Sequence, residues 1–105
     1  MTENEKKKKK FRQSKRWRDF RHYLNVKQNG VCYITKSKLR KLSAVHHMDL
    51  NPENYDDLNE ENFVFVLHSI HEAIHTLYTY YKKDPTVLER LKEVLDKMVE
   101  LNSIL

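Results

Sequence analysis

One set of residues constrains what this chain can fold into more than any other feature, and it consists of His46, His47, Asn62, His71 and His75. His71 and His75 are four residues apart, so a helix would project both imidazoles from the same face. His46 and His47 are adjacent, and neighbouring side chains of an extended strand point to opposite faces. If the end of such a strand lies across the helix, one of these two imidazoles can join the helical pair around a single cation while the other points elsewhere.

The size and composition of the chain are those of one small folded domain. Of its 105 residues, 39% are hydrophobic and 33% are charged, which is typical of a globular protein rather than a disordered one. The single cysteine, Cys32, excludes an intramolecular disulfide and a zinc site built from cysteines. No segment has the apolar character of a signal peptide or the length of a membrane span. We therefore expect a soluble protein of the reducing cytoplasm that does not enter a membrane.

Charge is distributed unevenly along the chain. Residues 1–50 contain 15 Lys and Arg against 4 Asp and Glu, whereas residues 51–105 contain 5 against 11. The run of lysines near the N-terminus would alone suit a solvated tail, but basic residues continue well beyond it, which indicates a nucleic-acid partner for the N-terminal half. The residues expected to contact DNA are Lys7, Lys8, Lys9, Lys10, Arg12, Lys15, Arg16, Arg18 and Arg21.

Hydrophobic periodicity predicts a first helix over residues 14–27. Ser14 is a suitable N-cap, and apolar side chains recur on one face from Trp17 to Leu24. Gly30, the only glycine, is expected to adopt the left-handed conformation that ends such a helix.

The middle of the chain is typical of short strands joined by polar loops. Residues 31–35 predict a strand, and a turn over 36–38 would return the chain along 42–47. Residues 49–59 have the composition of a loop, and an extended apolar run follows at 63–67.

Two helices are predicted after that run. The first carries His71 and His75 to about Lys82, and its apolar residues Ile70, Ile74, Leu77 and Tyr78 are expected to cover the sheet. Asp84 is a suitable N-cap for a second helix over about 86–102, whose apolar stripe predicts a core face, a docking face for a protein partner or a dimer contact. The expected organisation is a disordered basic tail at 1–13, a domain at 14–83 and an amphipathic helix at 84–105.

Three short segments carry a resemblance to a known family. They are Ala44-Val45-His46-His47, Glu61-Asn62-Phe63-Val64 and His71-Glu72-Ala73-Ile74-His75, with 14 residues between His47 and Asn62 and 8 between Asn62 and His71. This pattern resembles the HNH motif of the ββα-metal nuclease superfamily, with gaps similar to those of the nuclease bacteriocins. Residues 14–35 resemble the lead-in of small HNH proteins carried by phages and mobile introns, so the likeness covers about 14–80. The chain lacks the Cys-x-x-Cys zinc knuckles common in phage relatives, since Cys32 occupies only the first such position.

The resemblance implies an α+β fold with a ββα-metal (HNH) core, made of a short antiparallel hairpin and a helix and flanked by an N-terminal basic helix and a C-terminal amphipathic helix. It implies a divalent-metal-dependent endonuclease that nicks or cuts double-stranded DNA. His46, His71 and His75 would hold one divalent ion, whose identity is open among Mg²⁺, Mn²⁺, Zn²⁺ and Ni²⁺, and His47 would be the general base.

Two further positions belong to the implied site. Asn62 would fix the loop that orients His47, and Arg40 lies where the bacteriocin nucleases have a phosphate-contacting arginine, although a general basic contact suits it equally well. His22 and His68 are expected to be surface residues or to support the ligands. The implied setting is the cytoplasm of a bacterial host, for a protein encoded by a phage or mobile element.

Two other functions remain open from the sequence. The fold could serve as a non-catalytic module that binds DNA or protein, although such a module has no need for a histidine outside the ligand set. The segment from His71 to His75 also fits the H-E-x-x-H signature of zinc peptidases, with Glu72 as base. That hypothesis needs a third ligand downstream and leaves the basic half unexplained. The sequence does not distinguish homing, genome packaging, restriction and recombination as biological roles.

Overall fold

A computed structural model describes residues 2–49, 52–54 and 56–103, so positions 50, 51 and 55 of the expected loop lie outside it. The chain divides into two units, Met1–His71 and Glu72–Leu105, each of which is described by itself. The described residues form a mixed α+β structure with a two-stranded antiparallel sheet, which confirms the expected class. In chain order the elements are α1 (Glu3–Arg12), α2 (Lys15–Lys27), β1 (Ala44–His47), η1 (Pro52–Asn54), η2 (Glu60–Asn62), β2 (Phe63–Val66), α3 (His68–Lys83) and α4 (Val87–Leu101).

Helix α1 forms where the sequence predicted a disordered basic tail, so that prediction was wrong for residues 3–12. Thr2 caps the helix, because its hydroxyl accepts the backbone N–H of Glu5 at 3.1 Å. Acidic residues occupy the first turn and basic residues the last, which suits the helix dipole at both ends. Lysine is also a good helix former, so a lysine run favours a helix once a cap is present.

Helix α2 follows α1 after a two-residue turn and confirms the predicted helix at 14–27. The hydroxyl of Ser14 accepts the N–H of Trp17 at 3.2 Å, as expected of an N-cap. Leu24 is buried on the inner face of the helix. After the helix, Asn29 and Gly30 have φ values of 58° and 71°, so the predicted left-handed glycine is present.

The predicted strand at 31–35 is absent, and the segment is a set of turns with one isolated bridge from Val31 to Lys38. The backbone turns instead of extending, because the N–H of Lys36 donates to the Cys32 carbonyl at 2.9 Å and Lys36 has a left-handed φ of 61°. The Cys32 Sγ, a weak acceptor, also lies 3.5 Å from the backbone nitrogens of Thr35 and Leu67.

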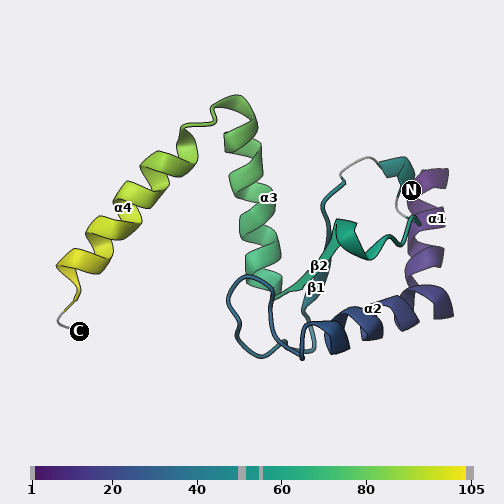
Figure 1. Ribbon diagram of the computed structural model, residues 1–105. Helices are drawn as coiled ribbons and strands as arrows, with labels where there is room; N and C mark the ends of the chain where they lie inside the picture. Colours follow the sequence, from purple (N-terminus) through teal and green to yellow (C-terminus); the bar gives the residue numbers. More distant parts are fainter. Residues whose placement is uncertain (1, 50–51, 55, 104–105) are drawn as a thin grey trace. The chain divides into compact units, whose positions relative to one another are not determined.

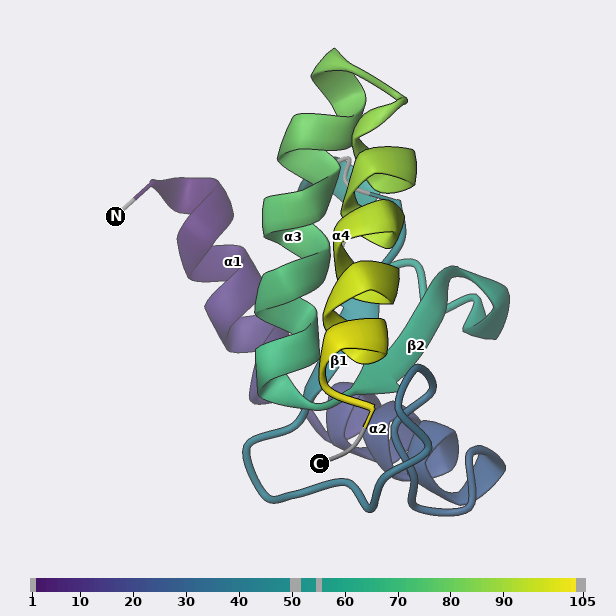
Figure 2. The same ribbon diagram turned by 90° about the vertical axis from the view of Figure 1, so that its left-hand side faces the viewer.

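Strands β1 and β2 form the hairpin at the centre of the first unit, above helix α2 (Figures 1 and 2). The register pairs Val45 with Phe65 and His47 with Phe63. Cross-strand partners share a face, so these four side chains lie on one side of the sheet. His46, paired with Val64, lies on the opposite side.

Aromatic side chains form most of the core between the hairpin and α2. Phe63 and Phe65 are both 4% exposed, and they pack with Leu24. The ring of Phe20 meets that of Phe63 at 4.9 Å, edge to face, and the ring of Trp17 lies 6.1 Å from it. Helix α2 is therefore anchored to the strand that pairs with the two histidines.

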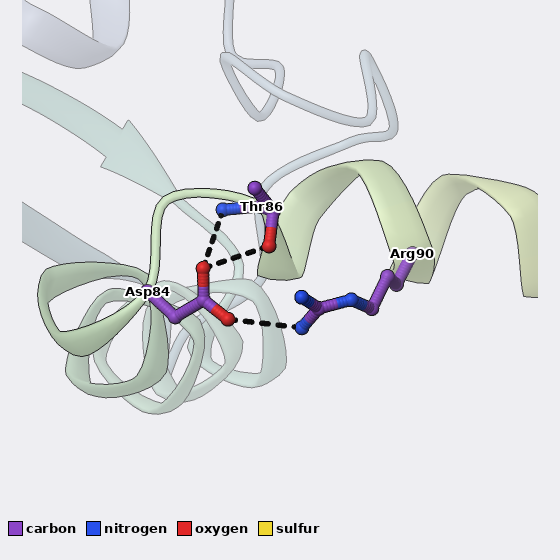
Figure 3. Close-up of polar contacts among 3 residues, drawn as sticks. All are labelled: Asp84, Thr86 and Arg90. Carbon is purple, nitrogen blue, oxygen red and sulfur yellow. Dashed lines mark hydrogen bonds and ion pairs between the residues drawn. The ribbon is translucent and has the colours of Figure 1, made fainter.

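The second unit contains most of α3 and all of α4. Neither helix contains a buried residue among those described, and Tyr78, which was expected to cover the sheet, is 45% exposed. Asp84 lies in the turn between them rather than at the N-cap, which is Thr86 (Figure 3). The Asp84 carboxylate still accepts the N–H of Thr86 at 3.0 Å and pairs with Arg90, so it supports the helix start from two residues further upstream.

Candidate functional site

His46 and His71 come together within the first unit. His46 is 7% exposed on β1, and its ring centroid lies 5.4 Å from that of His71 in the first turn of α3. β2 ends at Val66 and α3 begins at His68, so a single residue separates the strand from the helix. Because this connection is short, His71, the fourth residue of α3, lies close to His46 on β1.

His75 follows His71 by one turn of the same continuous helix, so helix geometry places it on the same face. One ring nitrogen from each of His46, His71 and His75 lies within 4.8 Å of the others. Two imidazole nitrogens that bind one zinc ion tetrahedrally at about 2.1 Å lie about 3.4 Å apart, so the rings must move closer together to hold an ion. Three imidazoles suit Zn²⁺ and Ni²⁺ better than Mg²⁺ or Mn²⁺, which prefer oxygen ligands.

His47 occupies a different environment from its neighbour. Its ring stacks on that of Phe63, with centroids 4.3 Å apart and planes 13° from parallel. Its Nε2 is buried and has no hydrogen-bond partner among the described residues. The adjacent histidines therefore lie on opposite faces, as the sequence predicted, and His47 is outside the three-histidine group. The stacking of Phe63 on His47 was not predicted from the sequence. Antiparallel pairing of residues 44–47 with 63–66 places the two residues opposite each other.

Asn62 closes the loop between the strands through its backbone. Its carbonyl accepts the N–H of Met48, the residue after His47, at 2.8 Å. The preceding turn η2 is capped by Asn59, whose side chain accepts the N–H of Glu61 at 3.2 Å. These bonds hold the end of β1 against the start of β2, and the orienting role expected of the Asn62 side chain stays a prediction.

Arg40 lies in the loop before β1, with its side chain exposed. A tight turn fixes its backbone, because its N–H donates to the Ser43 hydroxyl at 2.8 Å and its carbonyl accepts the Ser43 N–H at 3.0 Å. Among the described residues no hydrogen bond, ion pair or ring contact links its side chain to the histidines. It lines an open hollow of about 560 Å³ with Ser37, Lys38, Leu39 and Leu67.

The residues expected to contact DNA fall on α1 and α2, but they are not equally available. Most are exposed, including Lys7, Lys9, Lys10 and Arg12. Arg21 is different, since its guanidinium lies 5.1 Å from the centroid of the Phe65 ring and donates to the Ser43 carbonyl at 3.3 Å. Arg21 therefore joins α2 to β1 and β2 as part of the fold.

One of the other cations is paired within α2. Lys15 forms an ion pair with Asp19 at 2.8 Å, and its hydrogen bond lowers the pKa of the Asp19 carboxyl. Both side chains are largely exposed, so this pair adds little stability and leaves the lysine accessible to a phosphate.

Two side chains to which the sequence analysis assigned no structural role, Gln28 and Cys32, hold this frame together. The Gln28 amide pairs with the backbone of Phe65, accepting its N–H at 2.9 Å and donating to its carbonyl at 2.8 Å. Cys32 is fully buried, and although burial raises the pKa of its thiol, hydrogen bonds centred on Thr35 and Leu67 outweigh that effect and lower the pKa to about 7.

Comparison with protein-family models, with curated proteins and with solved structures found no match to this chain. Among the described residues, no helix combines the length and apolar character needed to span a membrane.

Proposed function

We propose that this chain is an HNH-type endonuclease that uses one divalent metal ion to hydrolyse phosphodiester bonds in double-stranded DNA. The observation that carries the proposal is the different placement of two adjacent histidines. His46 lies with His71 and His75 in a group able to hold an ion, while His47 lies on the opposite face against Phe63. A metal-assisted hydrolase needs a general base that is not itself a ligand of the ion.

In this proposal His46, His71 and His75 hold the ion, which when bound supplies positive charge that stabilises the transition state and the departing oxygen. The stacking of His47 on Phe63 restricts the imidazole plane, and burial of Nε2 leaves Nδ1 as the nitrogen that meets water. Nδ1 takes a proton from that water as its oxygen bonds to phosphorus. The bond from phosphorus to the 3′ oxygen breaks, and that oxygen takes a proton from solvent, leaving 5′-phosphate and 3′-hydroxyl ends.

DNA is proposed as the substrate because of the positive charge on helices α1 and α2. Exposed lysines and arginines on α1 and α2 suit a phosphate backbone. Helix α2 packs on the hairpin through the aromatic core, and Phe11 of α1 meets Trp17 of α2. Arg40 is proposed to contact a phosphate near the scissile bond, since its backbone is fixed immediately before β1 while its side chain is exposed.

The test is cleavage of supercoiled plasmid by the full chain with Mg²⁺, Mn²⁺, Ni²⁺ or Zn²⁺, with a chelator as the blank. We expect nicking that depends on the ion, and a loss of about 100-fold or more in His47→Ala with metal binding retained. His22→Ala, at an exposed position on α2, is the matched control and should cleave normally. A chain that binds metal and DNA without cleaving would instead be the non-catalytic binding module, and normal cleavage by His47→Ala would exclude its role as base.

A further inference from the structure

Helix α4 presents an apolar face to solvent. Its apolar side chains recur every three or four residues and occupy one side of the helix, while the charged side chains occupy the other. The exposed members are between 44% and 70% exposed, and they are Leu88, Val94, Leu95, Met98, Val99 and Leu101. A helix with such a stripe is stable in water only when the stripe packs against another element.

Within the described part of the second unit, nothing covers this face. Neither α3 nor α4 contains a buried residue, and the two helices diverge from the turn at Asp84 (Figure 1). α3 adds to the exposed surface, because Tyr78 is 45% and Tyr81 is 40% exposed. The open helical hairpin therefore has apolar surface on both of its arms.

The charges of this unit indicate what kind of partner fits. Residues 72–105 contain 5 Lys and Arg against 6 Asp and Glu, so the unit is nearly neutral, unlike residues 1–71 with 15 against 9. Three cations around α4 already pair within the unit, Arg90 with Asp84, Lys92 with Asp96 and Lys97 with Glu100. A polyanion or an anionic lipid surface finds little free positive charge here, whereas an identical helix meets almost no net repulsion.

We propose that α4 binds a second copy of this chain, so that two α3–α4 hairpins pack as a helical bundle. The size of the exposed face suits this occupant. Half-exposed aliphatic and tyrosine side chains on α4 and α3 together offer roughly 500 Å² of apolar surface per copy. A stable homodimer buries about 800 Å² per partner, of which about 65% is apolar, or about 500 Å². This dimer goes beyond the proposed nuclease activity and uses none of its residues.

The first test is the mass of the full chain by sedimentation equilibrium across micromolar concentrations. We expect twice the 12.8 kDa chain mass for the wild type, and dimerisation weakened at least tenfold in Leu95→Lys. Glu93→Lys, on the polar side of the same helix, makes a similar change as the matched control and should remain dimeric. A wild-type monomer with intact helicity, or equal effects of the two substitutions, would overturn the proposal.

The second test is oxidative cross-linking, which does not depend on weakening the dimer. Cys32 is 0% exposed, so a new surface cysteine is the reactive thiol. Leu95→Cys should form a disulfide between copies rapidly, and Glu93→Cys slowly. Equal, slow cross-linking of both would mean random collision and would contradict pairing through α4. Zinc binding by His46, His71 and His75 should be unchanged in every variant, which separates failure of the dimer from failure of the nuclease site.

Discussion

The two units of this chain use apolar side chains in opposite ways. In the first unit they form a core in which Leu24, Phe63 and Phe65 are nearly inaccessible, and polar side chains such as Gln28 and Arg21 bond into it. In the second unit a similar supply of apolar residues stays at least partly exposed on two helices. The candidate site depends on the packed unit for its geometry, because His46 and His47 lie on a strand held by that core. The second unit is free to serve association.

The largest expected difference between the units is in stability. Leu24→Ala removes a side chain that is 2% exposed and should lower the free energy of unfolding by about 2–5 kcal/mol. Leu95→Ala, on exposed α4, should change it by less than about 1 kcal/mol when Trp17 fluorescence reports unfolding of the first unit in urea. Similar decreases in both variants would mean that α4 contributes to the same core.

The buried thiol of Cys32 gives the packed unit a dependence on pH between neutral and alkaline values. The pKa of Cys32 is about 7 in the fold against an ordinary 9.0, so the folded state favours the thiolate. The contribution of this thiolate to the free energy of unfolding is complete above pH 9 and is lost as the pH falls through 7. Relative to Cys32→Ala, the wild type should gain about 2 kcal/mol in free energy of unfolding between pH 7 and 9. If the free energy of unfolding of the two proteins changed with pH in parallel, Cys32 would not make this contribution.

The charge difference between the units should appear in DNA binding. Replacing Lys7, Lys8, Lys9 and Lys10 with glutamine keeps residues that favour a helix but removes four cations from α1. The log-log slope of affinity against salt should flatten by about 0.9 for each phosphate that the variant no longer neutralises. Replacing Lys82 and Lys83 in the second unit is the control and should leave the slope nearly unchanged. The reverse result would place the DNA-binding surface on the second unit.

The smallest expected effect is local to the turn in Figure 3. Hydrogen bonds from Thr86 and Arg90 lower the pKa of the Asp84 carboxyl, so the contribution of this carboxylate is lost as the pH falls through its folded pKa. Asp84→Ala should speed amide hydrogen exchange in the first turn of α4 without altering the first unit. Faster exchange in β1 or β2 would show that the two regions are coupled.

Local signals in the sequence predicted much of the fold. Ser14 and Gly30 marked the limits of α2, and the alternation of β1 placed His46 and His47 on opposite faces. These features depend on residues close together in the chain, for which capping and periodicity are sufficient.

The errors came from contacts that join distant residues or from competing local bonds. The predicted strand at 31–35 fails because a local bond from the Lys36 N–H to the Cys32 carbonyl turns the chain there. No local pattern revealed that Arg21, whose contact with DNA stays a prediction, donates to the Ser43 carbonyl and lies over the Phe65 ring. For the site, spacing predicted that one of His46 and His47 joins His71 and His75, and the resemblance to the HNH motif implied that it is His46. The stacking of His47 on Phe63 could be predicted only from the strand register.

The central claim, that three histidines hold one ion while their neighbour does not, is tested most directly by calorimetric titration of the full chain with Zn²⁺ or Ni²⁺. We predict one ion per chain, with binding abolished in His46→Ala and in His71→Ala and unchanged in His47→Ala. Equal loss of affinity in His47→Ala and His71→Ala, or no binding by the wild type, would contradict the account.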